Sequence, residues 1–417
     1  MPPTSYSATP SSGSRSGSVR SKTAPYQRQD ASMSVTGNPT VTLVMSMTHH
    51  VPGWGCASRG IPRCRAVRPA WQGGVMATLR ERIPAPTQLE LPSPVSGIVF
   101  RPGSRDDLVG MHAVAVAAAA LDDPRARPST ADLDRSLSTE GLIVDQDTVV
   151  GVDADGRVQA YGIVIDVPSR VTAARAVLGG AVHPRYRSRG VGRRLLAWQV
   201  GRARQRLAAL DIDLPATLDV GGRSGAPVLA LAERLGFRPV RHWVEMELVF
   251  ADHAVDDLPI PAFPDDLVLR RAAPDDIEPM RAAKNDAFRD HWGSQPMVAS
   301  DWRGFLTAPK SRLDLSRLVV DPLGNVLAFA VVEVDPDGFA ARGRAFGSVH
   351  WVGVVRSARG RGLAPLVLGA ALAAMRADGL SAAVLDVDTE NPSGAARIYE
   401  RLGFARGEVH VTAALSL

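Results

Sequence analysis

The sequence predicts an α/β (α+β) protein built from two tandem copies of one unit, after a disordered N-terminal tail. Each copy is expected to form a mixed, mainly antiparallel sheet flanked by helices. Three observations lead to this fold class. The chain repeats itself in ordered blocks, each copy has hairpin turns between short strands, and each has a glycine-rich loop between an apolar strand and a helix.

The tail comprises residues 1–94. The 417-residue chain has a formal net charge of +5, yet residues 1–94 alone hold 10 Lys+Arg against 3 Asp+Glu. The segment is rich in Ser, Pro, Gly and Arg and lacks periodicity, so it cannot bury enough apolar surface to become ordered. We expect a solvated extension, or a stretch translated from a wrong start with Met76 as the true one. A basic arm that binds nucleic acid is the disfavoured alternative, because no aromatic residues alternate with the basic ones.

Composition excludes several classes of protein. Only two cysteines, Cys56 and Cys64, occur in the chain, which excludes a disulfide scaffold. Their spacing to His49 and His50 matches no usual zinc pattern, so we expect no metal site. No apolar run approaches the ~18 residues of a transmembrane helix, and no apolar segment follows the N-terminus as in a secretory signal. A cytoplasmic protein without a membrane partner is the expectation.

The repeat decides the architecture. Four blocks recur in the same order: Asp106-Asp107 with Asp275-Asp276, Arg187–Gly192 with Arg359–Ala364, Leu218–Val220 with Leu385–Val387, and Glu233–Phe237 with Glu400–Phe404. Their spacing drifts by only a few residues, as loop insertions would cause. We therefore expect one domain at residues 95–251, a linker at 252–263 with two prolines and a third directly after it, and a second domain at 264–417.

Each copy shows the same order of elements. After an opening strand and a helical stretch, strands are expected at Thr148–Val152, Gly156–Ile165 and Ala174–Val182, and in the second copy at Leu318–Val320, Val326–Val334 and Gly347–Val355. The following helices bury one face, with apolar residues at Leu196, Val200, Ala203, Leu207 and Leu210 in the first copy and at Leu368, Leu372 and Met375 in the second. A further strand, a helix and a last strand complete each copy.

The candidate ligand-binding residues lie at the junction of a strand, a loop and a helix in each copy. Its pattern is Arg-x-x-Gly-x-Gly/Ala, in which glycines allow a tight bend and the helix N-terminus presents amides suited to a pyrophosphate. The arginines can add charge-assisted hydrogen bonds. The spacing is neither that of a Rossmann fingerprint nor that of a Walker loop. An ordinary tight turn is the simpler interpretation. The pattern recurs in the same context in both copies, however, and this recurrence argues against a mere turn.

At these residues the chain resembles two tandem GCN5-related N-acetyltransferase (GNAT) domains. The resemblance implies that acetyl-CoA is the cosubstrate and that its pantetheine arm lies on the strand before each loop, with the pyrophosphate on the loop. It implies these cofactor contacts: Val352, Gly353, Val354, Arg359, Gly360, Arg361, Gly362, Leu363, Ala364 and Asn391 in the second copy, and Val182, Arg187, Ser188, Arg189, Gly190, Val191 and Gly192 in the first.

The two copies differ at the residue that the family commonly uses as general acid. In the second copy Asn391 and Tyr399 match the family's Asn and Tyr, and the tyrosine would protonate the departing CoA thiolate. The equivalent positions in the first copy are Ser224 and Ala232, and a methyl group cannot donate a proton. A packed aromatic residue is the structural alternative for Tyr399. We therefore expect a degenerate first domain and an active second one.

The general base is left open between residues of neighbouring strands. Glu333 and His350 are the first candidates, and Asp386 and Asp388 are further ones. The segment Asn285–Gly293 mixes aromatic and charged groups and borders the acceptor site in the family. It could equally be a helix end with a packed tryptophan.

The sequence thus predicts direct transfer of an acetyl group from acetyl-CoA to a small-molecule primary amine by the second domain. The layout is similar to that of the mycothiol synthases, tandem members of this family, which acetylate a cysteinyl pseudodisaccharide. That narrower activity, acetylation of antibiotics or other small amines, and a non-catalytic acyl-CoA-binding regulator all stay open. The pattern does not determine the oligomeric state.

Overall fold

The computed structural model describes residues 77–167, 170–252, 262–289, 294–390 and 395–417. Most of the expected tail, including both cysteines, lies outside the described residues, as does most of the linker. The strands of the first copy are β1 (Val99–Pro102), β2 (Thr148–Val152), β3 (Val158–Asp166), β4 (Ala174–Val182), β5 (Ala216–Arg223) and β6 (Arg238–Val249). Its helices are α1 (Leu79–Arg82), α2 (Leu108–Asp122), α3 (Thr130–Leu137), α4 (Val144–Asp147), α5 (Val191–Ala208) and α6 (Pro227–Arg234).

The second copy repeats the order of the strands and of the two helices that follow the loops. Its strands are β7 (Val268–Arg271), β8 (Arg317–Val320), β9 (Val326–Glu333), β10 (Phe346–Val354), β11 (Ala382–Asp388) and β12 (Ala405–Ser416). Its helices are α7 (Ile277–Ala287), α8 (Ala299–Leu306), α9 (Phe339–Arg342), α10 (Leu363–Ala377) and α11 (Ala395–Arg401). The mixed α/β fold predicted from the repeat is confirmed.

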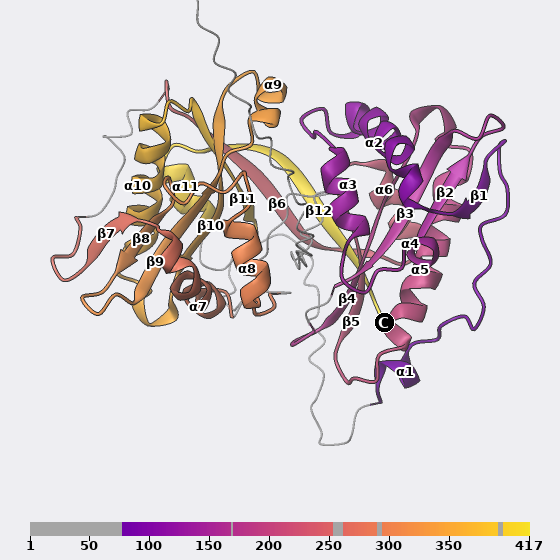
Figure 1. Cartoon of the computed structure of the whole chain (residues 1–417), viewed down its shortest axis with the longest axis horizontal. Helices are drawn as coiled ribbons and strands as arrows, with labels where there is room; N and C mark the ends of the chain where they lie inside the picture. Colours follow the sequence, from indigo (N-terminus) through magenta and orange to yellow (C-terminus); the bar gives the residue numbers. More distant parts are fainter. Residues whose placement is uncertain (1–76, 168–169, 253–261, 290–293, 391–394) are drawn as a thin grey trace, which may run out of the picture. The chain divides into compact units, whose positions relative to one another are not determined.

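The described strands form one continuous sheet in the order β1-β2-β3-β4-β5-β12-β6-β11-β10-β9-β8-β7 (Figure 1). Only β4 with β5 and β10 with β11 pair in parallel, and the other neighbours are antiparallel. Each parallel pair is joined through the glycine-rich loop and a long helix, the crossover that parallel strands require.

The last strand of each copy is exchanged. β6, which ends the first copy, pairs with β11 of the second, and β12, which ends the second copy, pairs with β5 of the first. The two exchanged strands also pair with each other. The sequence boundaries at 251 and 264 therefore separate the copies but not the two cores.

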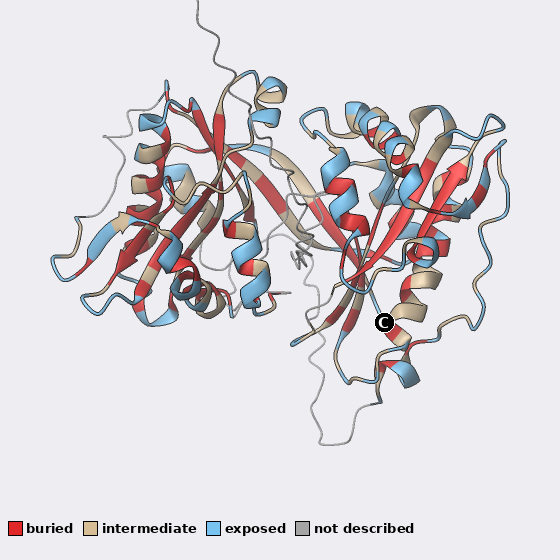
Figure 2. Ribbon diagram, viewed as in Figure 1, coloured by how far each residue is buried: buried red, intermediate tan, exposed pale blue. Residues whose placement is uncertain are grey.

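Both cores include residues from the exchanged strands. Met246 and Leu248 of β6 are fully buried in the core of the second copy, and Ala413 of β12 belongs to that of the first. Strands β3, β9 and β11 are largely buried, β6 and β12 are buried only in part, and the outer faces of most helices are exposed (Figure 2).

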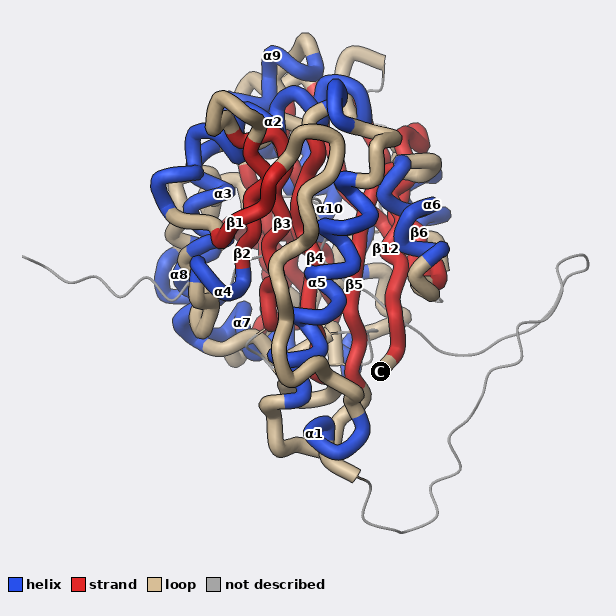
Figure 3. Tube along the Cα trace, turned by 90° about the vertical axis from the view of Figure 1, so that its right-hand side faces the viewer, coloured by secondary structure: helices blue, strands red, loops and turns tan. Residues whose placement is uncertain are grey.

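The two long helices position the loops. α5 lies across β3, β4 and β5 (Figure 3), with Leu196, Ala203 and Leu207 buried against the sheet. α10 packs in the same way on the second copy, where its apolar stripe Leu368, Leu372 and Met375 is fully buried. A helix with one apolar face packed on a sheet fixes the direction of its N-terminus, and hence the place of the loop.

The tail boundary predicted at residue 94 is wrong for residues 77–94. Leu79 is fully buried and its amide donates to the carbonyl of Ile212 at 2.8 Å. Farther along, Gln205 and Arg194 of α5 donate to the carbonyls of Pro86 and Ser93, each at 2.8 Å. A few apolar anchors and carbonyls that accept from α5 hold this proline-rich stretch, although its composition alone would not order it.

Candidate active site

In each copy the two parallel strands pair briefly and then part. β10 pairs with β11 over Phe346–Ser348, and β4 pairs with β5 over Ala174–Val177. Beyond these residues β10 and β4 continue in register only with their antiparallel neighbours. We call the point where the strands part the fork. Backbone groups that leave a ladder are free to bind a ligand laid between the strands, because a strand edge offers a row of donors and acceptors.

The loop after each forked strand bends through left-handed residues. Gly360 and Gly362 have φ of +80° and +73°, and their counterparts Ser188 and Gly190 have φ of +58° and +87°. Gly362 and Gly190 are the residues that immediately precede α10 and α5, of 15 and 18 residues. The loops therefore present helix N-terminal amides, whose partial positive charge suits an anion such as a pyrophosphate.

The arginines of the two loops have different partners. Arg187 donates through both terminal nitrogens to Asp122, at 2.6 and 2.7 Å, and through Nε to the carbonyl of Val182 at 3.2 Å. Its counterpart Arg359 donates to a backbone carbonyl, that of Ala287, at 2.8 Å. Part of the positive charge of the first loop is thus neutralised by a carboxylate, as it also is in the second loop through Arg361 and Asp266.

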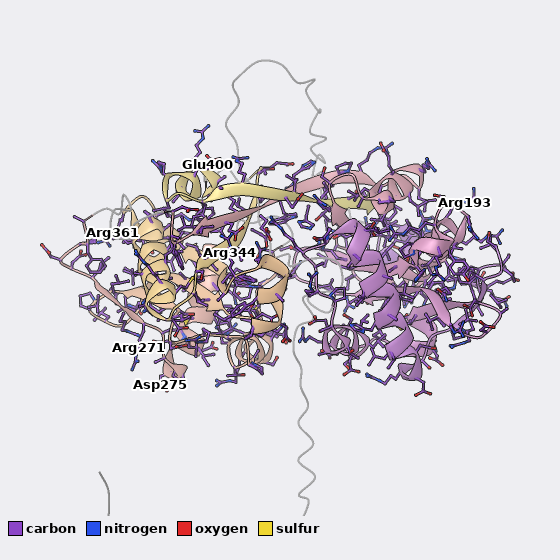
Figure 4. The ribbon with its side chains drawn as sticks, turned by 90° about the horizontal axis from the view of Figure 1, so that it is seen from above. Arg193, Arg271, Asp275, Arg344, Arg361 and Glu400 are labelled. Atoms are coloured by element: carbon purple, nitrogen blue, oxygen red, sulfur yellow. The ribbon has the colours of Figure 1, made fainter. Side chains whose placement is uncertain are left out.

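Other loop arginines reach the surface. Arg361 pairs with Asp266 at 2.9 Å, where both side chains are well exposed and the pair contributes little stability. Arg193, in the first turn of α5, is exposed like Arg361, and Figure 4 shows both at the surface. Arg189 is exposed, and its carbonyl accepts from Ser96 at 3.2 Å.

Gly353 is a strict requirement of the forked strand β10. A Cβ at this position would lie 2.4 Å from the ring of Phe329 and 3.0 Å from that of Phe288. Its neighbours Val352 and Val354 are half-buried, as is Val182 at the same place in β4. The two aromatic rings thus cover one face of β10. The edge of its backbone faces the fork.

Tyr399 lies on α11, the short helix that follows β11. Tyr399 is half-buried with its ring 6.0 Å from that of Phe404, and burial raises the pKa of its phenol to about 12. Its counterpart Ala232 on α6 is fully buried. Asn391 lies outside the described residues.

The two first candidates for the base lie together. His350 Nδ1 is 3.1 Å from Glu333 Oε2, across the β9–β10 pair. His350 is the extra residue of a bulge in β10 between Val349 and Trp351. Its ring packs against Phe305 and Trp351, with centroids 4.7 and 4.6 Å away. The register and the bulge together make this pair, and neither is visible in the sequence.

The further candidates are placed differently. Asp388 is buried at the end of β11, where desolvation raises its pKa to about 6 and Arg241 lies 3.5 Å away. In the segment 285–293, the Asn285 side chain exchanges two hydrogen bonds with the backbone of Met297, and Asp286 accepts from the amide of Arg356. Residues 290–293 lie outside the described residues.

One buried charge was missed by the sequence analysis. Lys284 of α7 is 1% exposed, and among the described residues it contacts the carbonyl of Gln295 at 3.4 Å and the ring of Phe288. Burial lowers its pKa to about 8. No sequence signal distinguishes this lysine from a solvent-facing one.

The profile of the acetyltransferase (GNAT) family matches the chain twice, at residues 115–237 and 277–404. The chain belongs to this family. Both matches end at the Gly-Phe that follows Ala232 and Tyr399, so they include the forks, the loops and the helices α6 and α11.

Named relatives and solved structures agree with this assignment. The chain is 34% identical to a mycothiol acetyltransferase of Arthrobacter sp. (strain FB24) over 56% of this chain and 68% of that protein. It is 32% identical to one of Pseudarthrobacter chlorophenolicus over 67% and 80%. The crystal structure of a GCN5-related N-acetyltransferase from Sphaerobacter thermophilus covers 78% of this chain and 97% of its own, with 25% identity and a TM-score of 0.60. A tandem GNAT protein from the clavulanic acid pathway shares the fold at 19% identity, a TM-score of 0.54 and coverage of 76% and 98%.

Members of the GNAT family use acetyl-CoA as cosubstrate, and the second copy has the features that would hold it. The strand edges at its fork have backbone groups that could bind the cosubstrate. Its loop has two left-handed glycines, and the N-terminus of α10 presents amides suited to an anion. Among the described residues no cluster of metal-ligating side chains occurs, and no helix there is long and apolar enough to cross a membrane.

Proposed function

We propose that this GNAT acetyltransferase moves an acetyl group from acetyl-CoA to a primary amine of a small molecule, and that the second copy does the chemistry. The observation that carries the proposal is the difference between the copies on α6 and α11. Both have a fork and a loop, but Tyr399 supplies a proton donor where the first copy has Ala232. An acyl transfer that expels a thiolate gains from an acid at that position.

In the proposed reaction the amine attacks the thioester carbonyl carbon directly. Backbone amides at the fork of β10 stabilise the oxyanion, a contribution that is often the largest in acyl transfer. Val352, Gly353 and Val354 border the pantetheine arm. Arg359, Gly360, Arg361, Gly362, Leu363 and Ala364 border the pyrophosphate, and Asn391 is proposed from the family pattern alone. Tyr399 protonates the CoA thiolate, and the amine proton passes to a group of β9 or β10.

The first copy is proposed as the degenerate partner. Its equivalent residues, Val182 and Arg187–Gly192, keep the loop geometry, but Asp122 holds Arg187. A non-catalytic role in binding acyl-CoA is supported for this half only, because Ala232 replaces the acid. We propose no nucleic-acid or membrane partner and no metal.

The test is release of free CoA thiol from acetyl-CoA with a panel of primary amines. The panel includes the cysteinyl pseudodisaccharide that mycothiol synthases acetylate, because relatives of this chain bear the name mycothiol acetyltransferase. Turnover on one amine at a rate well above hydrolysis that is reduced by Tyr399→Phe supports the proposal. Binding of acetyl-CoA by calorimetry with no turnover on any amine would replace the enzyme with a regulator.

A further inference from the structure

Glu333 lies at the level of the fork. In the register of β9 with β10, Glu333 pairs with Ser348, and Ser348 is the last residue of β10 that pairs with β11. If the arm of the cosubstrate follows β10 from the loop, its thioester ends where the strands part. A side chain on β9 beside that point is one strand away from the reacting carbon, about 5 Å in a sheet.

The members of the Glu333–His350 pair differ in how an acceptor can reach them. The Glu333 side chain is 20% exposed, and one of its oxygens, Oε2, is the atom that lies near His350. The His350 side chain is 13% exposed, and its Nε2 is buried without a hydrogen-bond partner among the described residues. Phe305 and Trp351 hold the ring on either side. A proton acceptor must come within hydrogen-bond reach of the amine, and only the carboxylate is open to it.

We propose that Glu333 takes the proton of the acceptor amine and that His350 is its positioning residue. This inference rests on the proposed function of the second copy. The imidazole, fixed by two aromatic rings, presents Nδ1–H to Oε2 and holds the carboxylate toward the fork. His350 Nδ1 lies within hydrogen-bond distance of Glu333 Oε2, whereas the charged side chains of Lys310 and Asp335 pair with each other at 2.6 Å.

The step balances without a further reactant. The amine nitrogen forms a bond to the acetyl carbon as its proton passes to Glu333. The carbon–sulfur bond breaks, and the sulfur takes a proton from Tyr399. The extra proton on Glu333 and the one missing from Tyr399 are exchanged with water after the product leaves.

The experiment compares five proteins on the same amine over a range of pH: wild type, Glu333→Gln, His350→Phe, His350→Asn and Asp335→Asn. Gln keeps the shape of Glu333 but cannot accept a proton, so kcat should fall by ~10²-fold or more while the KM for acetyl-CoA stays unchanged. Asp335→Asn, two residues along the chain, is the control that should match wild type.

The histidine variants separate positioning from packing. Phe keeps the aromatic contacts and removes the donor, so kcat should fall while the KM for acetyl-CoA stays unchanged, because the carboxylate is no longer held by a hydrogen bond. Asn retains an N–H donor and should restore part of the lost kcat. An unchanged kcat in His350→Phe, or a larger loss of kcat in that variant than in Glu333→Gln, would overturn the proposal.

A structure determination without turnover keeps the test independent of the proposed function. The Glu333 carboxylate should lie within hydrogen-bond distance of residue 350 in wild type and in His350→Asn, and it should leave that position in His350→Phe. An unmoved carboxylate in His350→Phe refutes the positioning role. If wild type acetylates no amine, the proposed function has failed, whereas the structures still decide whether His350 positions Glu333.

Discussion

Met246 of the first copy lies directly opposite Leu385 of the second, in the register of β6 with β11, and both side chains are buried. The contact exists because the copies exchange their last strands. Each core is therefore completed by residues that are distant in sequence, and neither half contains a whole sheet of its own. This arrangement couples the stability of the proposed active half to that of the degenerate half.

The coupling predicts the effect of a cavity at the exchanged strand. Met246→Ala should lower the free energy of unfolding by about 2–5 kcal/mol, since a fully buried side chain leaves a void in the second core. Loss of acetyltransferase activity should track unfolding in a single transition measured by circular dichroism and by activity. Leu323→Ala, at a site 87% exposed, is the control and should change little. Two separate transitions would contradict the coupling.

Local patterns predicted the elements well because strand and helix signals are short-range. Strands β2 (Thr148–Val152) and β4 (Ala174–Val182) match their predicted bounds, and the apolar stripe of α10 faces the sheet. The sequence did not predict that the two copies exchange β6 and β12. Both strands carry the same kind of apolar alternation, which specifies a sheet position but not which copy supplies the neighbour.

The candidate site likewise has features that local sequence patterns indicate and features that depend on tertiary structure. The loop and Tyr399 could be named as candidates from the sequence because their residues are contiguous and have required backbone geometry or chemistry. The pairing of Glu333 with His350 depends on a strand register and on a bulge, and the burial of Lys284 depends on how α7 packs. These are tertiary relationships, and a lysine or a glutamate in a half-polar segment carries no mark of them.

The two loops give a matched pair of substitutions. Ser188 adopts a left-handed conformation that costs a residue with a Cβ ~1 kcal/mol, so Ser188→Gly should raise thermal stability slightly. Gly360→Ala places the same strain in the second loop, where no side chain would be met within 4 Å. It should lower stability by a similar amount and raise the KM for acetyl-CoA. Equal KM values in all three proteins would show that the second loop does not hold the cosubstrate.

Lys284 predicts a pH dependence of stability. Burial lowers its pKa from 10.5 to about 8, so between these values the unfolded chain binds more protons than the folded one. The free energy of unfolding should therefore contain a contribution that rises from about pH 8 to above pH 10. Lys284→Met should remove this rise and, near pH 7, stabilise the protein by about 1–3 kcal/mol. Denaturant titrations at several pH values measure both effects. Lys310→Met, at a half-exposed lysine paired with Asp335, is the control and should keep the slope.

Tyr399 predicts a separation of chemistry from binding. Burial raises the pKa of its phenol to about 12, so the hydroxyl keeps its proton through the neutral range and can donate it as the thiolate departs. Tyr399→Phe should lower kcat by ~10²-fold, the usual cost of losing a general acid, with unchanged affinity for acetyl-CoA in calorimetry. In wild type, kcat should show no alkaline loss attributable to this phenol below about pH 10, because only the protonated form is competent. Unchanged turnover in Tyr399→Phe would mean that Tyr399 is only a packed aromatic residue beside Phe404. Weaker acetyl-CoA binding with unchanged kcat would mean that it is a binding residue instead.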